Sequence, residues 1–323
     1  MDFLKPYATL IESEIHHLKL PEAPSTLYDP QKYILSSKAK RIRPILTLVA
    51  TGMCGKNIRK SIPAALAVEL VHNFSLIHDD IMDQAKSRRG NDTVHVKWNS
   101  STAILSGDGM LIQAMLQLQK VSEEIDYKKL NRVFLEGINK VCEGQALDME
   151  FEDRLDVTTD EYLEMISGKT GALIAASLEM GGICSNADED KLNTLKELGF
   201  SLGKAFQIQD DILDVTADPE KFGKRKGGDI YEGKKTYLML QVLEHCNKDE
   251  RTWLINCLEN KTMKDVDVLR IIELYESCGI IEETKNVMNQ YYTKAEKALE
   301  MFEESKYKGD LLKLINFLKN REF

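Results

Sequence analysis

Apolar residues recur along most of this chain at steps of three and four positions, the spacing that places side chains on one face of an α-helix. Clear examples are Leu66 and Leu70 in one segment and Leu195, Leu198 and Leu202 in another. Alternating segments bounded by hairpin turns, which would predict strands, are nearly absent, and no Ser/Gly-rich or low-complexity stretch interrupts the chain. We therefore predict one all-α domain over residues 1–323.

Two acidic clusters with the same D-D-x-x-D pattern stand far apart within these helical stretches. They are Asp79-Asp80-Ile81-Met82-Asp83 and Asp210-Asp211-Ile212-Leu213-Asp214. The first and last aspartates of each cluster are four residues apart, so on a helix they share one face and could clasp a divalent cation. Mg²⁺ prefers carboxylates, water and substrate phosphates as ligands. The repeated pattern therefore predicts Mg²⁺ bound together with a phosphorylated ligand.

Net charge, cysteine spacing and the lack of long apolar runs exclude several classes of protein. The formal net charge of −9 argues against nucleic-acid binding, which needs a clustered basic surface. The six cysteines are scattered without C-x-x-C spacing, as is typical of buried thiols in a reducing compartment. The N-terminus lacks a basic start followed by an apolar run, and no uncharged stretch is long enough for a transmembrane segment. We expect a soluble cytoplasmic protein with no nucleic-acid partner.

Basic residues flank the first acidic cluster on both sides. Lys40, Arg41 and Arg43 precede it in the chain, and Arg88 and Arg89 follow it. The planar guanidinium of arginine matches phosphate oxygens with two parallel donors, and lysine adds a mobile point charge. Beside carboxylates that can bind metal, both groups are candidates for holding phosphate.

Two histidines lie close to the same cluster. His72 is seven residues before Asp79, two helical turns away on the same face, so it can point into the cavity that the aspartates border. His78 directly precedes the cluster, and we expect it to be structural.

Taken in order along the chain, these residues closely resemble the trans-isoprenyl diphosphate synthases, the polyprenyl synthetase family, and most of all short-chain geranylgeranyl diphosphate synthases of the archaeal type. The matching segments are residues 40–44 (KRIRP), 72–83 (HNFSLIHDDIMD), 88–90 (RRG), 168–170 (GKT), 206–214 (FQIQDDILD), and Gly144-Gln145 with Asp148. One departure is Lys38-Ala39, where the family usually has two glycines; we expect it to alter phosphate affinity. The resemblance implies a bundle of long helices around a deep central cavity, generally homodimeric, with the two aspartate clusters facing each other.

The resemblance also implies a reaction: Mg²⁺-dependent head-to-tail condensation of isopentenyl diphosphate with an allylic diphosphate. Three Mg²⁺ ions are expected with substrate bound, and the implied metal ligands are Asp79, Asp83 and Asp210. The implied catalytic residues are Asp79, Asp80, Asp83, Lys169, Thr170, Gln207, Asp210, Asp211 and Asp214. The residues implied to bind substrate are Lys40, Arg41, Arg43, His72, Arg88, Arg89, Gln145, Lys224, Lys234 and Arg321.

Within this set the resemblance separates two substrates. The allylic diphosphate would contact Arg88, Lys169 and Lys234, and isopentenyl diphosphate would contact Lys40, Arg43, His72 and Arg89. The Gly- and Lys-rich segment 222–236 resembles a loop that closes over the phosphates, and Arg321 is expected to help seal the cavity.

Product length depends, in synthases that resemble this chain, on the residues just before the first cluster. Phe74 is the fifth residue before it and the small Ser75 is the fourth. This combination is typical of enzymes that make the C20 product geranylgeranyl diphosphate. A farnesyl (C15) or bifunctional C15/C20 synthase remains the alternative.

Other classes of protein fit the sequence less well. A terpene cyclase or head-to-head synthase shares the first cluster, but a cyclase typically replaces the second with an Asn/Ser/Glu triad and lacks the K-R-x-R element. A non-catalytic partner subunit of a heteromeric synthase would have lost residues that contact the substrate, and this chain retains them all. A helical di-iron protein would need two Glu-x-x-His pairs, which we do not find.

Overall fold

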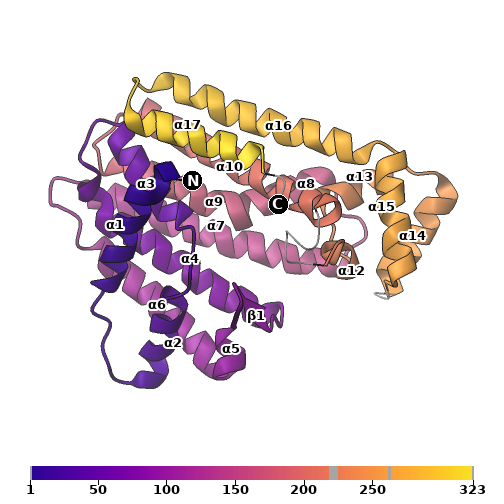
Figure 1. Ribbon diagram of the computed structural model, residues 1–323, viewed down its shortest axis with the longest axis horizontal. Helices are drawn as coiled ribbons and strands as arrows, with labels where there is room; N and C mark the ends of the chain where they lie inside the picture. Colours follow the sequence, from indigo (N-terminus) through magenta and orange to yellow (C-terminus); the bar gives the residue numbers. More distant parts are fainter. Residues whose placement is uncertain (1, 218–224, 261–262, 322–323) are drawn as a thin grey trace. The chain divides into compact units, whose positions relative to one another are not determined.

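The computed structural model describes residues 2–217, 225–260 and 263–321, and these residues are helical almost throughout (Figure 1). The only strands among them are β1 (Ser87–Arg88) and β2 (Asn91–Asp92), which pair as an antiparallel hairpin. The all-α class predicted from the spacing of apolar residues is therefore confirmed. None of the described helices is both long enough and apolar enough to cross a lipid bilayer.

Contacts within the chain divide it into two compact units. The first unit contains the described residues of Met1–Ile138, Ala176–Lys196 and Met301–Leu311. The second contains those of Asn139–Ala175, Glu197–Glu300 and Leu312–Phe323. A single domain over residues 1–323 stays a prediction.

The helices succeed one another along the chain with short connections. The first group is α1 (Lys5–His16), α2 (Ser25–Leu35), α3 (Ile42–Met53), α4 (Ile62–Met82), α5 (Val94–Lys97), α6 (Ser100–Leu118), α7 (Tyr127–Asp153) and α8 (Thr159–Ile166). A π-helical turn, η3 (Ser167–Gly171), precedes α9 (Ala172–Ile183) and α10 (Glu189–Thr216). The remaining helices are α12 (Gly228–Tyr231), α13 (Tyr237–His245), α14 (Lys248–Asn260), α15 (Asp265–Ser277), α16 (Ile280–Ala298) and α17 (Lys306–Lys319). Short 3₁₀ turns are η1 (Asp2–Leu4), η2 (Ile58–Ser61) and η4 (Leu299–Met301).

Helix α4 is the central element of the first unit and packs against α3 and α6. Apart from Glu69, its first half is apolar on every side, which is typical of a helix that is buried all round. Leu66, Val68 and Leu70 are accordingly buried, and each such side chain contributes roughly 1.5–3 kcal/mol to folding. This packing fixes the helix whose C-terminal end carries the first aspartate cluster.

In the second unit, the later part of α10 carries the second aspartate cluster, and α13 packs against α15 and α16. Leu198 and Leu202 on α10 are fully buried, as their helical spacing predicts.

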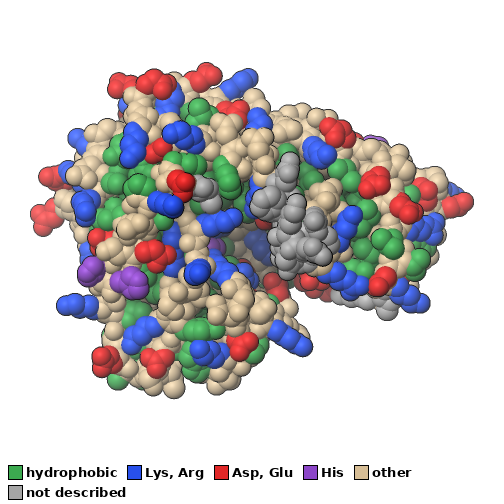
Figure 2. Space-filling view, in the orientation of Figure 1, with side chains coloured by type: hydrophobic (Ala, Val, Ile, Leu, Met, Phe, Trp, Pro, Cys, Tyr) green, Lys and Arg blue, Asp and Glu red, His purple; other side chains and the backbone are tan. Residues whose placement is uncertain are grey.

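Lys and Arg side chains are interspersed with Asp and Glu over the face drawn in Figure 2, with hydrophobic side chains between them. Such mixing suits a chain with a moderate negative net charge.

Candidate active site

The first aspartate cluster lies at the C-terminal end of α4, where Asp79 and Asp80 occupy the last turn and Asp83 is the C-cap residue. Asp79 and Asp83 are one turn apart on the same face. Carboxylates at this position face the negative end of the helix dipole, and a cation would relieve that repulsion, so these oxygen donors fit Mg²⁺. Among the described residues, no three acidic, His or Cys side chains gather closely enough to form a metal site by themselves. A magnesium ion that keeps water and substrate phosphate as ligands needs no such preformed cage.

Asp80 lies about 100° further around the helix and has a different environment. It is buried, and its Oδ1 accepts hydrogen bonds from Arg88 Nε (2.7 Å) and Nη2 (2.6 Å). The side chain of Arg88 is still about one-third exposed (32%). Asp80 therefore anchors Arg88 in a fixed orientation and leaves part of its donor surface open.

The β1–β2 hairpin that carries Arg88 is closed by the two-residue turn Arg89-Gly90. Their φ angles are 54° and 79°, the left-handed values of the type I′ turn that suits a two-residue hairpin. Glycine adopts this conformation freely, whereas arginine adopts it at a cost of roughly 1–3 kcal/mol. The Tyr33 hydroxyl donates to the Asp92 carbonyl (2.8 Å) and ties the hairpin to α2. The hairpin thereby holds Arg89 exposed at its tip.

Arg43, from the first turn of α3, meets His72 of α4. Its Nη1 lies 3.2 Å from His72 Nε2, and because a guanidinium can only donate, Nε2 accepts and the ring proton resides on Nδ1. Burial and the charge of Arg43 hold the pKa of His72 well below its usual range, so the ring is neutral. Burial also lowers the pKa of Arg43 to about 10. The pair therefore offers one positive charge and one neutral N–H donor, with Lys40 exposed nearby in the sequence.

Arg41 has different surroundings from Arg43, although the sequence assigned both to substrate binding. Its backbone is left-handed (φ 49°) and its side chain is only 1% exposed. The guanidinium donates to Glu12 Oε1 (2.7 Å), Glu69 Oε1 (2.6 Å) and the carbonyls of Leu35 (2.6 Å) and Ser37 (3.3 Å). With four hydrogen bonds inside the protein and almost no exposed surface, Arg41 has a structural role here, which argues against the direct substrate contact expected for it.

The second cluster lies near the C-terminal end of α10, and Asp210 there forms an ion pair with Arg321. The guanidinium of Arg321 also lies over the ring of Phe206, 4.9 Å from its centroid. Gln209 Nε2 donates to the carbonyl of Leu318 (2.7 Å), while the Tyr292 hydroxyl donates to Gln209 Oε1 (2.7 Å). The C-terminal end of α17 is therefore fixed to the helix that carries Asp210.

Asp211 and Asp214 are buried, unlike the partly exposed Asp210. Asp211 accepts hydrogen bonds from the Tyr162 hydroxyl and from Gln207 Nε2 (3.3 Å). Burial and the charge of Asp211 raise the pKa of Tyr162, so this hydroxyl stays protonated and donates. Asp214 Oδ2 accepts from the backbone N–H of Asp229 (3.1 Å). Asp211 therefore fixes the side chains of Tyr162 and Gln207, and Asp214 fixes the backbone at Asp229.

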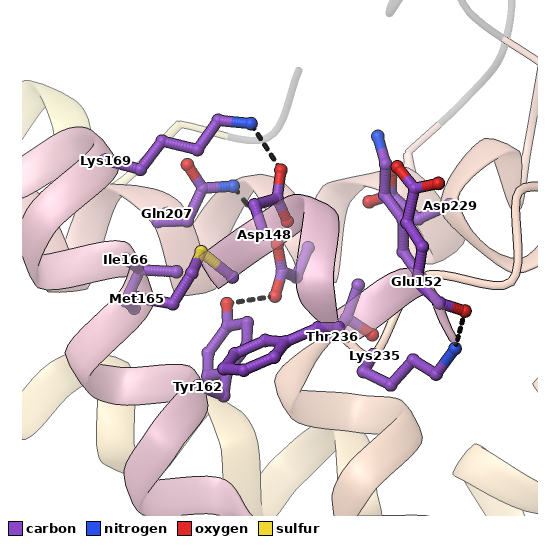
Figure 3. A pocket seen from close by; sticks show the side chains of 13 residues that line it. Asp148, Glu152, Tyr162, Met165, Ile166, Lys169, Gln207, Asp229, Lys235 and Thr236 are labelled. Atoms are coloured by element: carbon purple, nitrogen blue, oxygen red, sulfur yellow. Dashed lines mark hydrogen bonds and ion pairs between the residues drawn. The ribbon is translucent and has the colours of Figure 1, made fainter. Parts of the chain in front are cut away.

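Figure 3 shows a pocket of the second unit into which several predicted residues point. Lys169 forms an ion pair with Asp148 at its edge. The Thr170 hydroxyl donates to Gln207 Oε1 (3.0 Å), which fixes the amide so that its nitrogen faces Asp211. The hydroxyl of Thr170 and the amide oxygen of Gln207 are thus held in contact with each other.

The turn that carries Lys169 and Thr170 is the π-helical segment η3, an irregularity that is frequent at functional sites. It crosses α7 at Gly144, where an added Cβ would lie 2.1 Å from the Lys169 backbone nitrogen. No residue but glycine fits such an approach without displacing the backbone. Gln145, the next residue, is buried.

Two neighbouring lysines in the pocket lining have separate environments. Lys235 is buried and donates to the Glu152 carbonyl (2.8 Å), so it holds α7 (Figure 3). Lys234 is 40% exposed and pairs with Glu232 (2.7 Å) and Asp229 (3.5 Å). Lys234 therefore keeps part of its side chain open to solvent, and its contact with substrate stays a prediction. Lys224 lies outside the described residues.

The sequence-based set missed Glu69 and Tyr162. Glu69 left a signal, because it is the one acidic residue in the apolar first half of α4. Tyr162 left none, because its partner Asp211 is 49 positions away and the pairing depends on the fold.

The polyprenyl synthetase family model matches residues 24–275. The chain belongs to the polyprenyl synthetase family. It is 38% identical over 322 residues to the short chain isoprenyl diphosphate synthase of Methanothermobacter thermautotrophicus, covering 100% of this chain and 98% of that protein. It is 36% identical over 324 residues to a geranylgeranyl diphosphate synthase of Methanosarcina mazei, with the same coverage. The crystal structure of geranylgeranyl pyrophosphate synthetase from Pyrococcus horikoshii Ot3 superposes with a TM-score of 0.92 at 38% identity, covering 99% and 97% of the two chains.

Membership of the polyprenyl synthetase family makes this chain a prenyltransferase. The predicted family and the all-α isoprenoid synthase fold are thereby confirmed. Polyprenyl synthetases use Mg²⁺, in agreement with the oxygen donors at the ends of α4 and α10.

Proposed function

We propose that this polyprenyl synthetase condenses isopentenyl diphosphate head-to-tail with an allylic diphosphate and releases geranylgeranyl diphosphate. The proposal rests on one observation in the first unit. Side chains that can donate hydrogen bonds to phosphate, those of Arg43, His72 and Arg88, occur together with the carboxylates of α4 that can bind Mg²⁺. The names of the archaeal relatives support the C20 product.

The allylic diphosphate is assigned to the aspartate clusters. Asp79 and Asp83, and also Asp210, would hold up to three Mg²⁺ ions, which supply positive charge that stabilises the departing diphosphate. By resemblance to the family, Arg88, which Asp80 holds in place, is assigned to the same diphosphate, and so are Lys169 and Lys234. These fixed charges favour cleavage of the carbon–oxygen bond because negative charge develops on the leaving group.

Isopentenyl diphosphate is assigned to Lys40, Arg43, His72 and Arg89. The neutral His72 would donate from Nδ1, the nitrogen that Arg43 leaves protonated. The oxygens of Thr170 and Gln207 are proposed to stabilise the allylic cation as dipoles, without a covalent bond. Water must be excluded while the cation exists, and the released diphosphate can accept the proton lost after carbon–carbon bond formation.

Arg43→Ala and His72→Ala are each expected to raise the KM for isopentenyl diphosphate by about tenfold or more, because each removes a donor to its diphosphate. The KM for the allylic substrate should change by less than about twofold. Steady-state kinetics with each substrate varied in turn measures the difference. Equal losses for both substrates would show that the two subsites have been assigned wrongly.

The function itself is tested by incubating purified protein with Mg²⁺, isopentenyl diphosphate and each allylic starter, then sizing the dephosphorylated products. A C20 alcohol as the main product supports the proposal, and a C15 product would replace it with a farnesyl synthase. Cyclic products would identify a cyclase. No product from the chain alone would indicate a partner subunit.

We also propose a homodimer, as the resemblance implies. Leu105, Ile112 and Leu116 of α6 are 57%, 53% and 44% exposed, and their spacing gathers these large apolar side chains on one side of the helix. A second copy of the chain covering this stripe would bury it. Light scattering on the purified protein should give twice the monomer mass of 36.7 kDa, and a monomer would refute the proposal.

A further inference from the structure

Glu69 is a buried charge in a place where burial is costly. It is 1% exposed, within the apolar first half of α4. Helical spacing places His72 (i+3) and Asn73 (i+4) on its face, one turn closer to the aspartate cluster. A buried carboxylate without compensation costs several kcal/mol, so its presence calls for a partner or a role.

The contacts of Glu69 join separate parts of the first unit. Its Oε1 accepts from Arg41 Nη1 (2.6 Å) and from Asn73 Nδ2 (2.8 Å). Glu69 Oε2 and Arg43 Nε are both buried without a hydrogen-bond partner among the described residues. One carboxylate oxygen therefore holds the structural Arg41, while the other remains available to act on its surroundings through charge alone.

We infer that Glu69 is a positioning residue for the isopentenyl diphosphate subsite: its buried carboxylate is the fixed counter-charge that holds Arg43 against His72. The inference rests on the function proposed above and deepens it. Glu69 touches neither substrate, and it acts through Arg43.

The charges around Arg43 give the physical reason. Burial lowers the pKa of Arg43, Arg89 lowers it further, and Glu69 is the largest charge that opposes both. Arg41 is already neutralised by Glu12 and Glu69. Without the carboxylate, the half-buried Arg43 side chain would lower its energy by turning toward solvent, and it would then lose its contact with His72.

Glu69→Gln keeps the size and the hydrogen-bonding oxygen but removes the charge. We expect isopentenyl diphosphate, titrated alone without Mg²⁺ in a calorimeter so that no turnover occurs, to bind about tenfold more weakly to this variant. In kinetics, its KM for isopentenyl diphosphate should rise by a similar factor while the KM for the allylic substrate stays within about twofold. Glu69→Asp should lie between the two proteins. Unchanged or tighter binding to Glu69→Gln would overturn the inference, because a more positive pocket would then matter more than the position of Arg43.

The double variant Arg41→Met/Glu69→Leu tests whether Glu69 has only a structural role. It replaces the buried ion pair by apolar groups, so the protein should fold without the counter-charge of Glu69. If this variant binds isopentenyl diphosphate as tightly as the wild type, Glu69 serves only Arg41 and the inference is wrong. If the double variant still binds isopentenyl diphosphate weakly, the inference is supported. This result is decisive also when Glu69→Gln is too unstable to assay.

The matched control is Asp310→Asn, which removes the charge of another buried carboxylate of the same unit and so weakens the hydrogen bond that it accepts from the Tyr7 hydroxyl (2.7 Å). It should lower Tm without changing the affinity for isopentenyl diphosphate. An equal loss of affinity in this control would assign the effect of Glu69 to general destabilisation. If the wild-type protein forms no condensation product, the proposed function is refuted. If the wild-type protein is active but Glu69→Gln binds isopentenyl diphosphate like wild type, only the inference about Glu69 is refuted.

Discussion

Asp79→Ala and Asp210→Ala are each expected to reduce condensation by about 10²–10³-fold or more, the loss typical of removing one group that stabilises charge in the transition state. Both side chains are proposed Mg²⁺ ligands and neither is a core packing group. Asp79→Ala also removes a carboxylate from the negative end of the α4 dipole, so the stability of the helix should not fall. Product formation from isopentenyl diphosphate and a labelled allylic substrate measures the effect.

Circular dichroism should show unchanged helix content in both variants, and Asp249→Ala, in the exposed first turn of α14, is a control that should retain full activity. Excess chelator should stop the wild-type enzyme, and added Mg²⁺ should restore it. Full turnover in chelator, or near-normal rates in either aspartate variant, would contradict ionisation assisted by metal.

Phe74→Ala is expected to shift the products to chains longer than C20, and Ser75→Phe to shift them to C15 or shorter. Phe74 lies five residues before the cluster, roughly 7 Å from Asp79 along the helix axis, so its ring can limit the length of the growing tail. The ring is held edge-to-face against His78, with a centroid distance of 4.7 Å and an interplanar angle of 65°. That contact favours a rigid barrier, since an edge-to-face pair contributes about 0.5–1.5 kcal/mol beyond its burial.

Chromatography of the dephosphorylated products, at equal conversion for each variant, gives the chain-length distribution. His72→Ala serves as the comparison, because it should slow the reaction without lengthening the product. An unchanged distribution in both Phe74→Ala and Ser75→Phe would show that another part of the protein sets product length.

Sequence patterns predicted the elements and the chemical types of the site but not the partners of each side chain. Helical spacing correctly indicated that Asp79 and Asp83 share a face, and the same spacing separates Asp80, which the structure pairs with Arg88. Arg41 could not be told from Arg43 in the K-R-x-R element, because its burial follows from a left-handed backbone that few non-glycine residues adopt. Pairings such as Tyr162 with Asp211 depend on long-range packing and leave no local pattern.

Residues near the two ends of the chain form ion pairs with residues of the candidate site or of its support. Glu12 on α1 supplies one of the two carboxylates of Arg41, and Arg321, after α17, is the partner of Asp210. Both residues lie outside the segment 24–275 that matches the family model. A gene fragment trimmed to that segment would therefore leave a buried guanidinium with half of its counter-charge, and expression trials should keep both ends and carry purification tags on linkers long enough to spare Arg321.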